Sequence, residues 1–95
     1  MTNQFYVYNM TNRNNTTLYT GMTNDLRKRA FEHRNLFGSQ FATKYKTVKL
    51  VYFEVFADAW NAIRREKQIK AGSRQKKVDL IDKMNPRWRD LYDRL

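Results

Sequence analysis

The sequence predicts an α+β fold in which a three-stranded, mostly antiparallel sheet is flanked by helices. Its 95 residues, of which 41% are hydrophobic, suffice for one core, so residues 1–95 are expected to form a single domain. Two aromatic, β-branched runs separated by a short polar segment predict a hairpin, and a third, more apolar run is followed by helix-like segments. The predicted order of elements is therefore β-β-α-β-α-α.

The hairpin consists of strands expected over residues 4–10 and 17–22. Residues paired in an antiparallel ladder have position numbers with a constant sum. A turn about residues 13–14 would therefore place Tyr8 directly opposite Tyr19. On sequence alone, both tyrosines are ordinary strand formers.

A helix is expected over residues 24–34, with Thr23 or Asn24 as its N-cap. Gly21 precedes it and is expected to let the chain turn sharply from the second strand. The predicted turn would allow the side chains of this helix to face the tyrosine two residues before the glycine.

Residues 36–47, which include Gly38 and Ser39, are expected to form a loop. The run over residues 48–56 is too apolar to face water on both sides, so we expect it to be the central strand.

The remaining chain predicts two helices and a short helical turn. Asp58 is the expected cap of the first helix, which Gly72 ends. Ser73 is the expected cap of the second, which stops near Pro86. The turn lies over residues 87–95.

The charge balance points to a polyanionic partner. Nineteen Lys and Arg against nine Asp and Glu give a net charge of +10 and a pI near 10.2. This balance favours DNA or another nucleic acid, whereas an acidic membrane surface and simple solubility are the alternatives.

The chain contains no cysteine and one histidine, His33. Disulfide partners, a thiolate nucleophile and a multi-histidine metal site are excluded, so any metal would be a hard cation held by oxygens. No run approaches eighteen apolar residues and no secretory signal precedes the first strand, so no membrane partner and a cytoplasmic location are expected.

A carboxylate interrupts the apolar stripe of the helix that follows Asp58. Glu66 lies four residues after Ala62 and three before Ile69, so it shares their face. Burial of a lone carboxylate costs several kcal/mol, roughly, unless it is paired or binds a cation. Two readings remain open: an ion pair with Lys70 at i+4, and a metal ligand.

The first helix presents a similar conflict. Leu26, Ala30 and Phe31 are expected to face the core, while Arg29 and His33 stand four residues apart beside that stripe. Both can belong to a solvated basic face, or both can point toward a site.

A tyrosine is a poor base near neutral pH. Tyr8 and Tyr19 gain a catalytic meaning only if Arg29, His33 and a cation on Glu66 converge on them.

The spacing of these residues resembles that of the GIY-YIG endonuclease superfamily, and in particular its small, stand-alone members. "YVY" over residues 6–8 corresponds to GIY, and "YTG" over residues 19–21 corresponds to YIG. Arg29 and His33 follow the second tyrosine by ten and fourteen residues, as the family's helix residues do. Glu66 in "RREKQIK" matches the family's metal-binding glutamate, and the ending "MNPRWRDLY" is similar to that of the small group.

The resemblance implies a Mg²⁺-dependent endonuclease that hydrolyses DNA phosphodiester bonds with little sequence specificity of its own. Glu66 would hold one divalent cation, Mg²⁺ or another such as Mn²⁺. Tyr8 and Tyr19 would orient or activate the attacking water, with His33 beside them, and Arg29 would neutralise charge on the phosphoryl group. DNA repair or processing, including branched or damaged DNA, would be the setting.

The sequence departs from the family pattern at two places. Tyr6 replaces the first glycine, and no asparagine follows Glu66 by about a dozen residues. Asn85 lies nineteen residues on, in an Asn-Pro pair that suits a helix end. The alternative function is therefore a nucleic-acid-binding module of the same fold with weak or lost cleavage.

No room remains in the 95 residues for a separate DNA-binding domain, so the domain's own basic surface, or a protein partner, would supply binding. Phosphate contacts position a substrate without reading its bases. Residues 76–77 can equally form a solvated helix face. The candidate DNA contacts are Arg27, Lys28, Lys44, Lys46, Lys67, Lys70, Arg74, Lys76 and Lys77.

Overall fold

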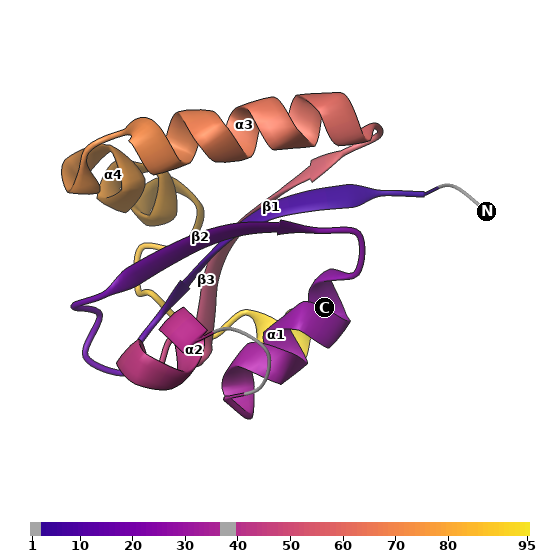
Figure 1. Ribbon diagram of the computed structural model, residues 1–95. Helices are drawn as coiled ribbons and strands as arrows, with labels where there is room; N and C mark the ends of the chain where they lie inside the picture. The colour runs from indigo at the N-terminus through magenta and orange to yellow at the C-terminus, as the bar shows by residue number, and fades with distance from the viewer. Residues whose placement is uncertain (1–2, 37–39) are drawn as a thin grey trace.

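The computed structural model describes residues 3–36 and 40–95, and it confirms the α+β class and the succession of predicted elements, with one additional helix (Figure 1). The elements are β1 (Phe5–Thr11), β2 (Leu18–Thr23), α1 (Leu26–Arg34), α2 (Gln40–Tyr45), β3 (Lys49–Phe56), α3 (Ala59–Ala71), α4 (Arg74–Met84) and a 3₁₀ turn (Tyr92–Arg94).

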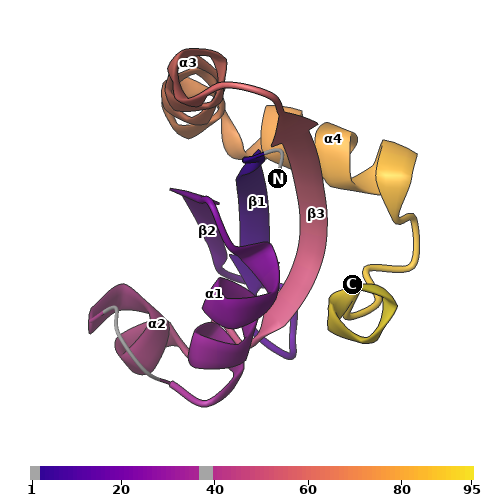
Figure 2. The same cartoon turned by 90° about the vertical axis from the view of Figure 1, so that its right-hand side faces the viewer.

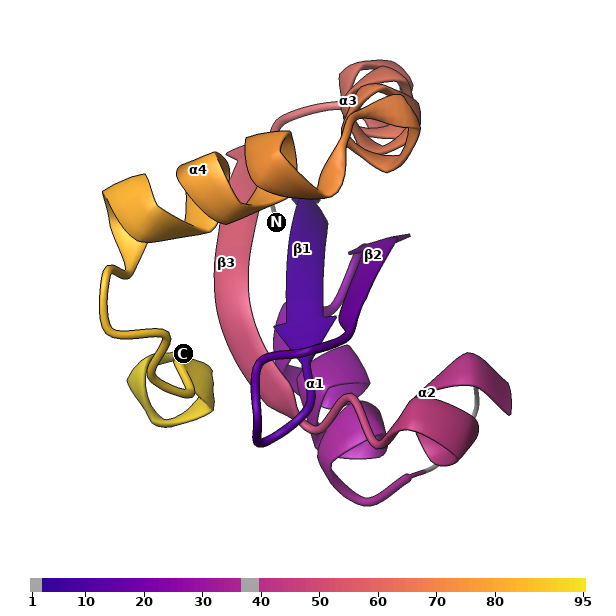
Figure 3. The ribbon, with the colours of Figure 1, turned by 90° about the vertical axis from the view of Figure 1, so that its left-hand side faces the viewer.

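The sheet has the order β2-β1-β3, with both strand pairs antiparallel. The expectation that residues 48–56 form the central strand is wrong, since β3 is an edge strand. Its apolar character has another cause: the C-terminal segment runs along its outer side and makes hydrogen bonds to it (Figure 3). Leu91 N donates to Leu50 O at 2.7 Å, and Asn85 Nδ2 donates to Val51 O at 3.1 Å.

The register of the hairpin differs from the predicted one by two residues. Tyr8 lies opposite Gly21, and Met10 lies opposite Tyr19. The reason is the connection, a loop over residues 12–17 that is centred between residues 14 and 15 instead of between 13 and 14. Asn12 closes this loop, because its Oδ1 accepts hydrogen bonds from the backbone nitrogens of residues 16 and 17 at 2.8 and 3.0 Å.

Helices cover both faces of the sheet (Figures 1 and 2). α3 and α4 lie on one side, whereas α1, α2 and the C-terminal turn lie on the other. On the α3 side, Val7 packs with Ala62 and Ile69. On the α1 side, a separate core cluster contains Tyr8, Met10, Leu26, Ala30, Leu50 and Leu91.

The cap of α1 is Asp25, not Thr23 or Asn24. Its side chain accepts a hydrogen bond from the backbone nitrogen of Lys28 at 3.1 Å, while Thr23 Oγ1 accepts one from the backbone nitrogen of Asp25. The helix therefore begins two residues later than expected. The helix caps predicted at residues 58 and 73 are confirmed, as is the end of α3 at residue 72.

The loop expected over residues 36–47 contains α2, so that prediction is wrong for its second half. Gly38 and Ser39 lie outside the described residues. A six-residue helix is too short to show a sequence periodicity, and its internal packing holds it: the rings of Phe41 and Tyr45, one turn apart, lie 4.6 Å from centre to centre. No helix in the described parts of the chain is long and apolar enough to cross a membrane.

Candidate active site

Three aromatic rings from β1, β2 and α1 meet beneath the sheet. A hydrogen bond joins Tyr8 Oη to His33 Nε2 at 3.3 Å. The ring centre of Tyr19 lies 6.2 Å from that of Tyr8 and 4.9 Å from that of His33. Tyr8 and His33 are 1% and 2% exposed, whereas Tyr19 is half-buried, so Tyr19 is the member of this group that solvent reaches.

Gly21 makes this arrangement possible because the Tyr8 phenol packs directly against its backbone. It lies inside β2, so the sharp turn predicted for it is not present. A Cβ atom on Gly21 would lie 2.6 Å from Tyr8 Oη and 2.9 Å from Cε1 of Tyr19. Only a residue without a side chain leaves room for the phenol at this place.

Helix α1 turns its apolar face and its histidine toward the sheet together. His33 is buried in line with Leu26 and Ala30, whereas Phe31 is 49% exposed, so the prediction that Phe31 faces the core is wrong. Arg29 lies at the rim of the site, with its side chain 44% exposed and its Nε 3.6 Å from an oxygen of Glu32.

Two charged side chains, Arg29 and Glu66, influence the pKa of Tyr8. Burial, followed by Tyr19, raises the pKa of the Tyr8 phenol above its ordinary value; Arg29 lowers this pKa and Glu66 raises it. Both charges therefore act on the Tyr8 hydroxyl, although they come from helices on opposite faces of the sheet. The structure thus brings Tyr8, Tyr19 and His33 into contact, while Arg29 and Glu66 influence the pKa of the Tyr8 phenol.

Burial also lowers the pKa of His33 below 6.5, and Arg29 lowers it further, against opposing effects of the Thr47 backbone and Glu32. His33 is consequently a neutral imidazole near pH 7. Its Nδ1 has no hydrogen bond of normal geometry to any described residue.

Glu66 occupies the predicted position on α3, between buried Ala62 and Ile69, with its side chain 21% exposed. Lys70 Nζ lies 3.5 Å from its Oε1, so the predicted ion pair is present. Among the described residues, no cluster of three or more acidic, histidine or cysteine side chains could hold a metal. A single carboxylate at the edge of the site still fits Mg²⁺, which keeps most of its waters and is commonly held by one or two carboxylates together with substrate phosphates.

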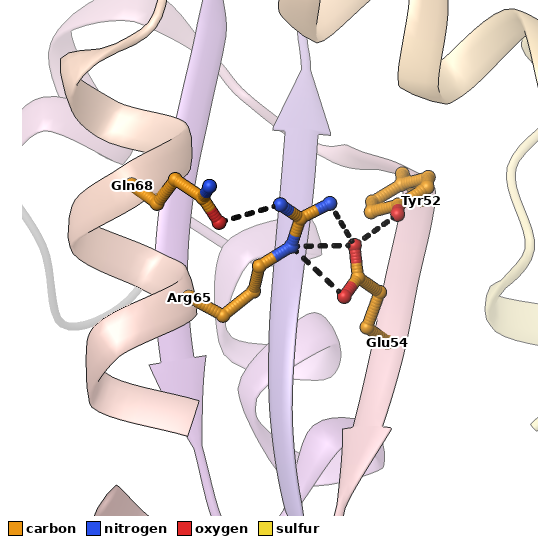
Figure 4. Close-up of polar contacts among 4 residues, drawn as sticks. All are labelled: Tyr52, Glu54, Arg65 and Gln68. Atoms are coloured by element: carbon orange, nitrogen blue, oxygen red, sulfur yellow. Dashed lines mark hydrogen bonds and ion pairs between the residues drawn. The ribbon is translucent and has the colours of Figure 1, made fainter. Parts of the chain in front are cut away.

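A second polar cluster lies on the other face of the sheet, and the sequence analysis did not identify it (Figure 4). Arg65 of α3 donates from Nε and Nη2 to the Glu54 carboxylate, at 2.9–3.1 Å, and from Nη1 to Gln68. The Tyr52 hydroxyl donates to the same carboxylate. The only sequence signal was a glutamate inside an apolar strand, and a strand-to-helix pair has no fixed spacing that would identify its partner.

Several of the nine candidate DNA contacts are committed to other parts of the chain. Arg27 donates to the Leu95 carbonyl oxygen and lies over the Tyr92 ring. Arg74 donates to the carbonyl oxygens of residues 15 and 16. The remaining lysines lie on three separate regions: Lys28 on α1, Lys44 and Lys46 at the end of α2, and Lys67, Lys70, Lys76 and Lys77 on α3 and α4.

Asn85 ends α4, as expected. It is 6% exposed, its Nδ2 donates to Val51 O and Arg89 O, and its Oδ1 accepts from Arg89 N. All its polar groups are thus used to hold the C-terminal segment against β3, so it has no free group for catalysis.

Comparison with known proteins supports the resemblance stated above. The family described as "GIY-YIG catalytic domain" matches residues 4–79. A UPF0213 protein of Staphylococcus saprophyticus is 43% identical over 65 residues, which cover 68% of this chain and 79% of the relative. A UPF0213 protein of Clostridium perfringens is 45% identical over 65 residues, covering 68% and 70%.

The fold is also similar to a solved structure. The solution NMR structure of a UPF0213 protein from Bacillus halodurans matches with a TM-score of 0.58 and 26% identity, over 92% of each chain.

Proposed function

Because this chain belongs to the GIY-YIG catalytic-domain family, we propose that it is an endonuclease that hydrolyses DNA phosphodiester bonds with the help of one divalent cation, Mg²⁺ or Mn²⁺. The observation that carries the proposal is the environment of the Tyr8 hydroxyl. It shares a hydrogen bond with His33 and packs against Gly21 beside Tyr19, and its pKa is lowered by Arg29 and raised by Glu66. Repair or processing of branched or damaged DNA is the setting that we propose for this activity.

The Tyr8–His33 pair removes the proton from the attacking water in this proposal. The raised pKa of Tyr8 keeps its phenol protonated near pH 7, so the phenol alone is a poor base. Neutral His33 is a proton acceptor at that pH, and its Nε2 can take the Tyr8 proton while the Tyr8 oxygen takes one from water.

Tyr19 and Arg29 are the members of the group that a phosphate can reach. The partly exposed phenol of Tyr19 can donate to a phosphate oxygen, and the guanidinium of Arg29 can stabilise the negative charge that grows in the transition state.

Glu66 would hold the cation, which supplies Lewis-acid stabilisation of the phosphate when it is bound. In its absence Glu66 pairs with Lys70, so the ammonium group and the cation compete for one carboxylate.

The exposed lysines provide the affinity for DNA. Such contacts go to phosphates, so binding should be salt-sensitive and weakly selective for sequence. Lys28, Lys44, Lys46, Lys67 and Lys76 are the most accessible candidates; Lys77 is half-buried, and the remaining cations already hold partners within the chain.

The test is nicking of supercoiled plasmid with Mg²⁺, using variants of the proposed site and matched variants outside it. Glu66→Gln and Tyr19→Phe should each lower the rate by about a hundredfold or more. Glu54→Gln and Tyr52→Phe make the same chemical changes outside the proposed site, in the cluster around Arg65, and these variants should cleave like the wild type while they remain folded.

One observation favours the second candidate, a DNA-binding module without efficient cleavage: the carboxylate of Glu66 is already paired. If wild type and all four variants nick at the same trace rate, and EDTA changes nothing, the nuclease proposal is wrong and the binding module stands.

A further inference from the structure

A chain of aromatic rings leads from the proposed catalytic centre to the surface. The Phe41 ring centre lies 5.4 Å from that of Tyr19, and that of Tyr45 lies 4.6 Å from that of Phe41. Tyr45, at the end of this chain, is 41% exposed. The exposed ring is therefore only two ring contacts from a tyrosine that we place at the scissile phosphate.

Tyr45 forms one wall of a pocket of ≈ 490 Å³, which we call the α2 pocket. It lies between the β1–β2 loop, the end of α1 and the end of α2. Its polar and aromatic lining comprises Asn12, Arg13, Asn14, Arg34, Tyr45 and Lys46. The volume lies within the range of small-ligand pockets and suits a single nucleotide.

The charges of the α2 pocket are those that a phosphate chain needs. Among the described residues, three cations and no acidic side chain line it. Arg34 is partly engaged, since it lies over the Tyr92 ring at 4.9 Å and 3.7 Å from Asp93. Within the described parts of the chain, Arg13 and Lys46 have no ion-pair partner.

The backbone around the α2 pocket is unusual. Of the four non-glycine residues with positive φ among those described, Leu36 (φ 62°) and Lys46 (φ 54°) line the pocket, and Asn15 (φ 58°) belongs to the loop that closes it. This conformation costs free energy, and such residues concentrate where the fold presents a binding surface.

We propose that the α2 pocket binds one unpaired nucleotide of a DNA strand next to the bond that is cut. The base stacks on Tyr45, and the flanking phosphates contact Arg13 and Lys46. An aromatic platform within a cationic groove is the arrangement by which proteins bind single-stranded nucleic acid, because every base has a stacking face and only an unpaired base can use it. This inference rests on the proposed function, and it specifies a single-stranded or splayed substrate.

The test measures binding without cleavage, by fluorescence anisotropy in EDTA. The probes are a labelled thymidine oligomer of about twelve nucleotides and a hairpin duplex of equal charge. Tyr45→Ala should weaken binding of the single strand by about tenfold and leave the duplex unchanged, while Tyr45→Phe should bind like the wild type. Arg13→Gln should weaken binding of the single strand more than binding of the duplex. Because Arg13 lies in an exposed loop, this variant also tests the proposal if Tyr45→Ala does not fold.

Trp60→Ala is the matched control, because Trp60 is 77% exposed at the start of α3, at the opposite end of the molecule from α2 (Figure 1). The proposal is overturned if Tyr45→Ala and Trp60→Ala have equal effects, if single strand and duplex weaken equally, or if the wild type binds neither probe.

The outcome of the nicking assay is independent of the outcome of the binding experiment. Tyr45-dependent binding in a protein that does not cut DNA would leave the α2 pocket assigned and refute the nuclease. DNA cleavage by a protein whose DNA binding does not depend on Tyr45 would support the nuclease and refute the assignment of the α2 pocket.

Discussion

The Tyr8 hydroxyl lies 3.3 Å from His33 Nε2, and this hydrogen bond joins the central strand to the helix that follows the hairpin, across 25 positions of sequence. Both side chains are buried, and the ring of the half-buried Tyr19 lies 4.9 Å from that of His33.

Gly21→Ala should move the Tyr8 phenol. The new methyl group would lie 2.6 Å from Tyr8 Oη and 2.7 Å from its Cζ, so the ring must shift, and overpacking of this kind costs about 1–3 kcal/mol of unfolding free energy. The measurement is urea unfolding, together with the nicking rate. Gly72→Ala is the control, since its methyl group meets nothing closer than 3.3 Å and should change stability less. An equal effect of the two substitutions would contradict this account of Gly21.

The stability of the protein should fall as the pH is lowered through the ordinary pKa of histidine. Burial lowers the pKa of His33 below 6.5, so the unfolded chain binds a proton at a higher pH than the folded chain does. The unfolded state therefore gains protons first, and the free energy of unfolding decreases as the pH drops below about 6.5. His33 is the sole histidine in the sequence, so urea unfolding at several pH values should show a flatter profile for His33→Gln. A ¹H NMR titration of the ring with a midpoint above 6.5 would refute the prediction.

Arg65→Met should destabilise the fold without abolishing catalysis. It removes the guanidinium that pairs with Glu54 at 2.9 Å, and both side chains are about a quarter exposed. The expected loss is about 1–3 kcal/mol, less than for a fully buried pair. A double-mutant cycle with Glu54→Gln should show coupling, because both substitutions break the same contact. The same Glu54 substitution should also lower the pKa of Tyr52, which burial and Glu54 raise to about 12.

Lys70→Gln should lower the Mg²⁺ concentration that cleavage requires. Removal of the ammonium group 3.5 Å from Glu66 frees that carboxylate for the cation, so the Mg²⁺ concentration at half-maximal nicking should fall. Stability should change by less than about 0.5 kcal/mol, because the pair is a partly exposed i,i+4 contact. Lys83→Gln is the charge-matched control, on α4 and outside the proposed contacts. An unchanged Mg²⁺ requirement would mean that Glu66 does not hold the cation.

The local part of the fold was predictable from the sequence. The caps at Asp58 and Ser73, the helix end at Gly72 and the position of Glu66 between Ala62 and Ile69 were all expected and are present. Each depends on residues within one or two helical turns, where hydrogen bonds and helical spacing act directly.

Among the predictions that failed, the central position of residues 48–56 depended on a distant part of the chain, whereas the cap of α1 and the loop that contains α2 failed locally. The register of Tyr8 depends on the loop that Asn12 closes. The sequence left open whether His33 is solvated or points toward a site, and its packing against tyrosines of two strands decides this. The edge position of β3 depends on a C-terminal segment forty residues further along, where Asp90 accepts a hydrogen bond from the backbone of Leu50.

The sequence by itself thus determined the class of fold, the elements with strong caps and the set of residues worth testing. The tertiary structure decided which of them touch: Gly21 serves as space for a phenol, Glu54 rather than Glu66 is bound by an arginine, and α2 places Tyr45 beside a cationic pocket. The physical reason is that caps and helical faces are set by short-range contacts, whereas register, burial and ion pairing between elements depend on how all of them pack at once.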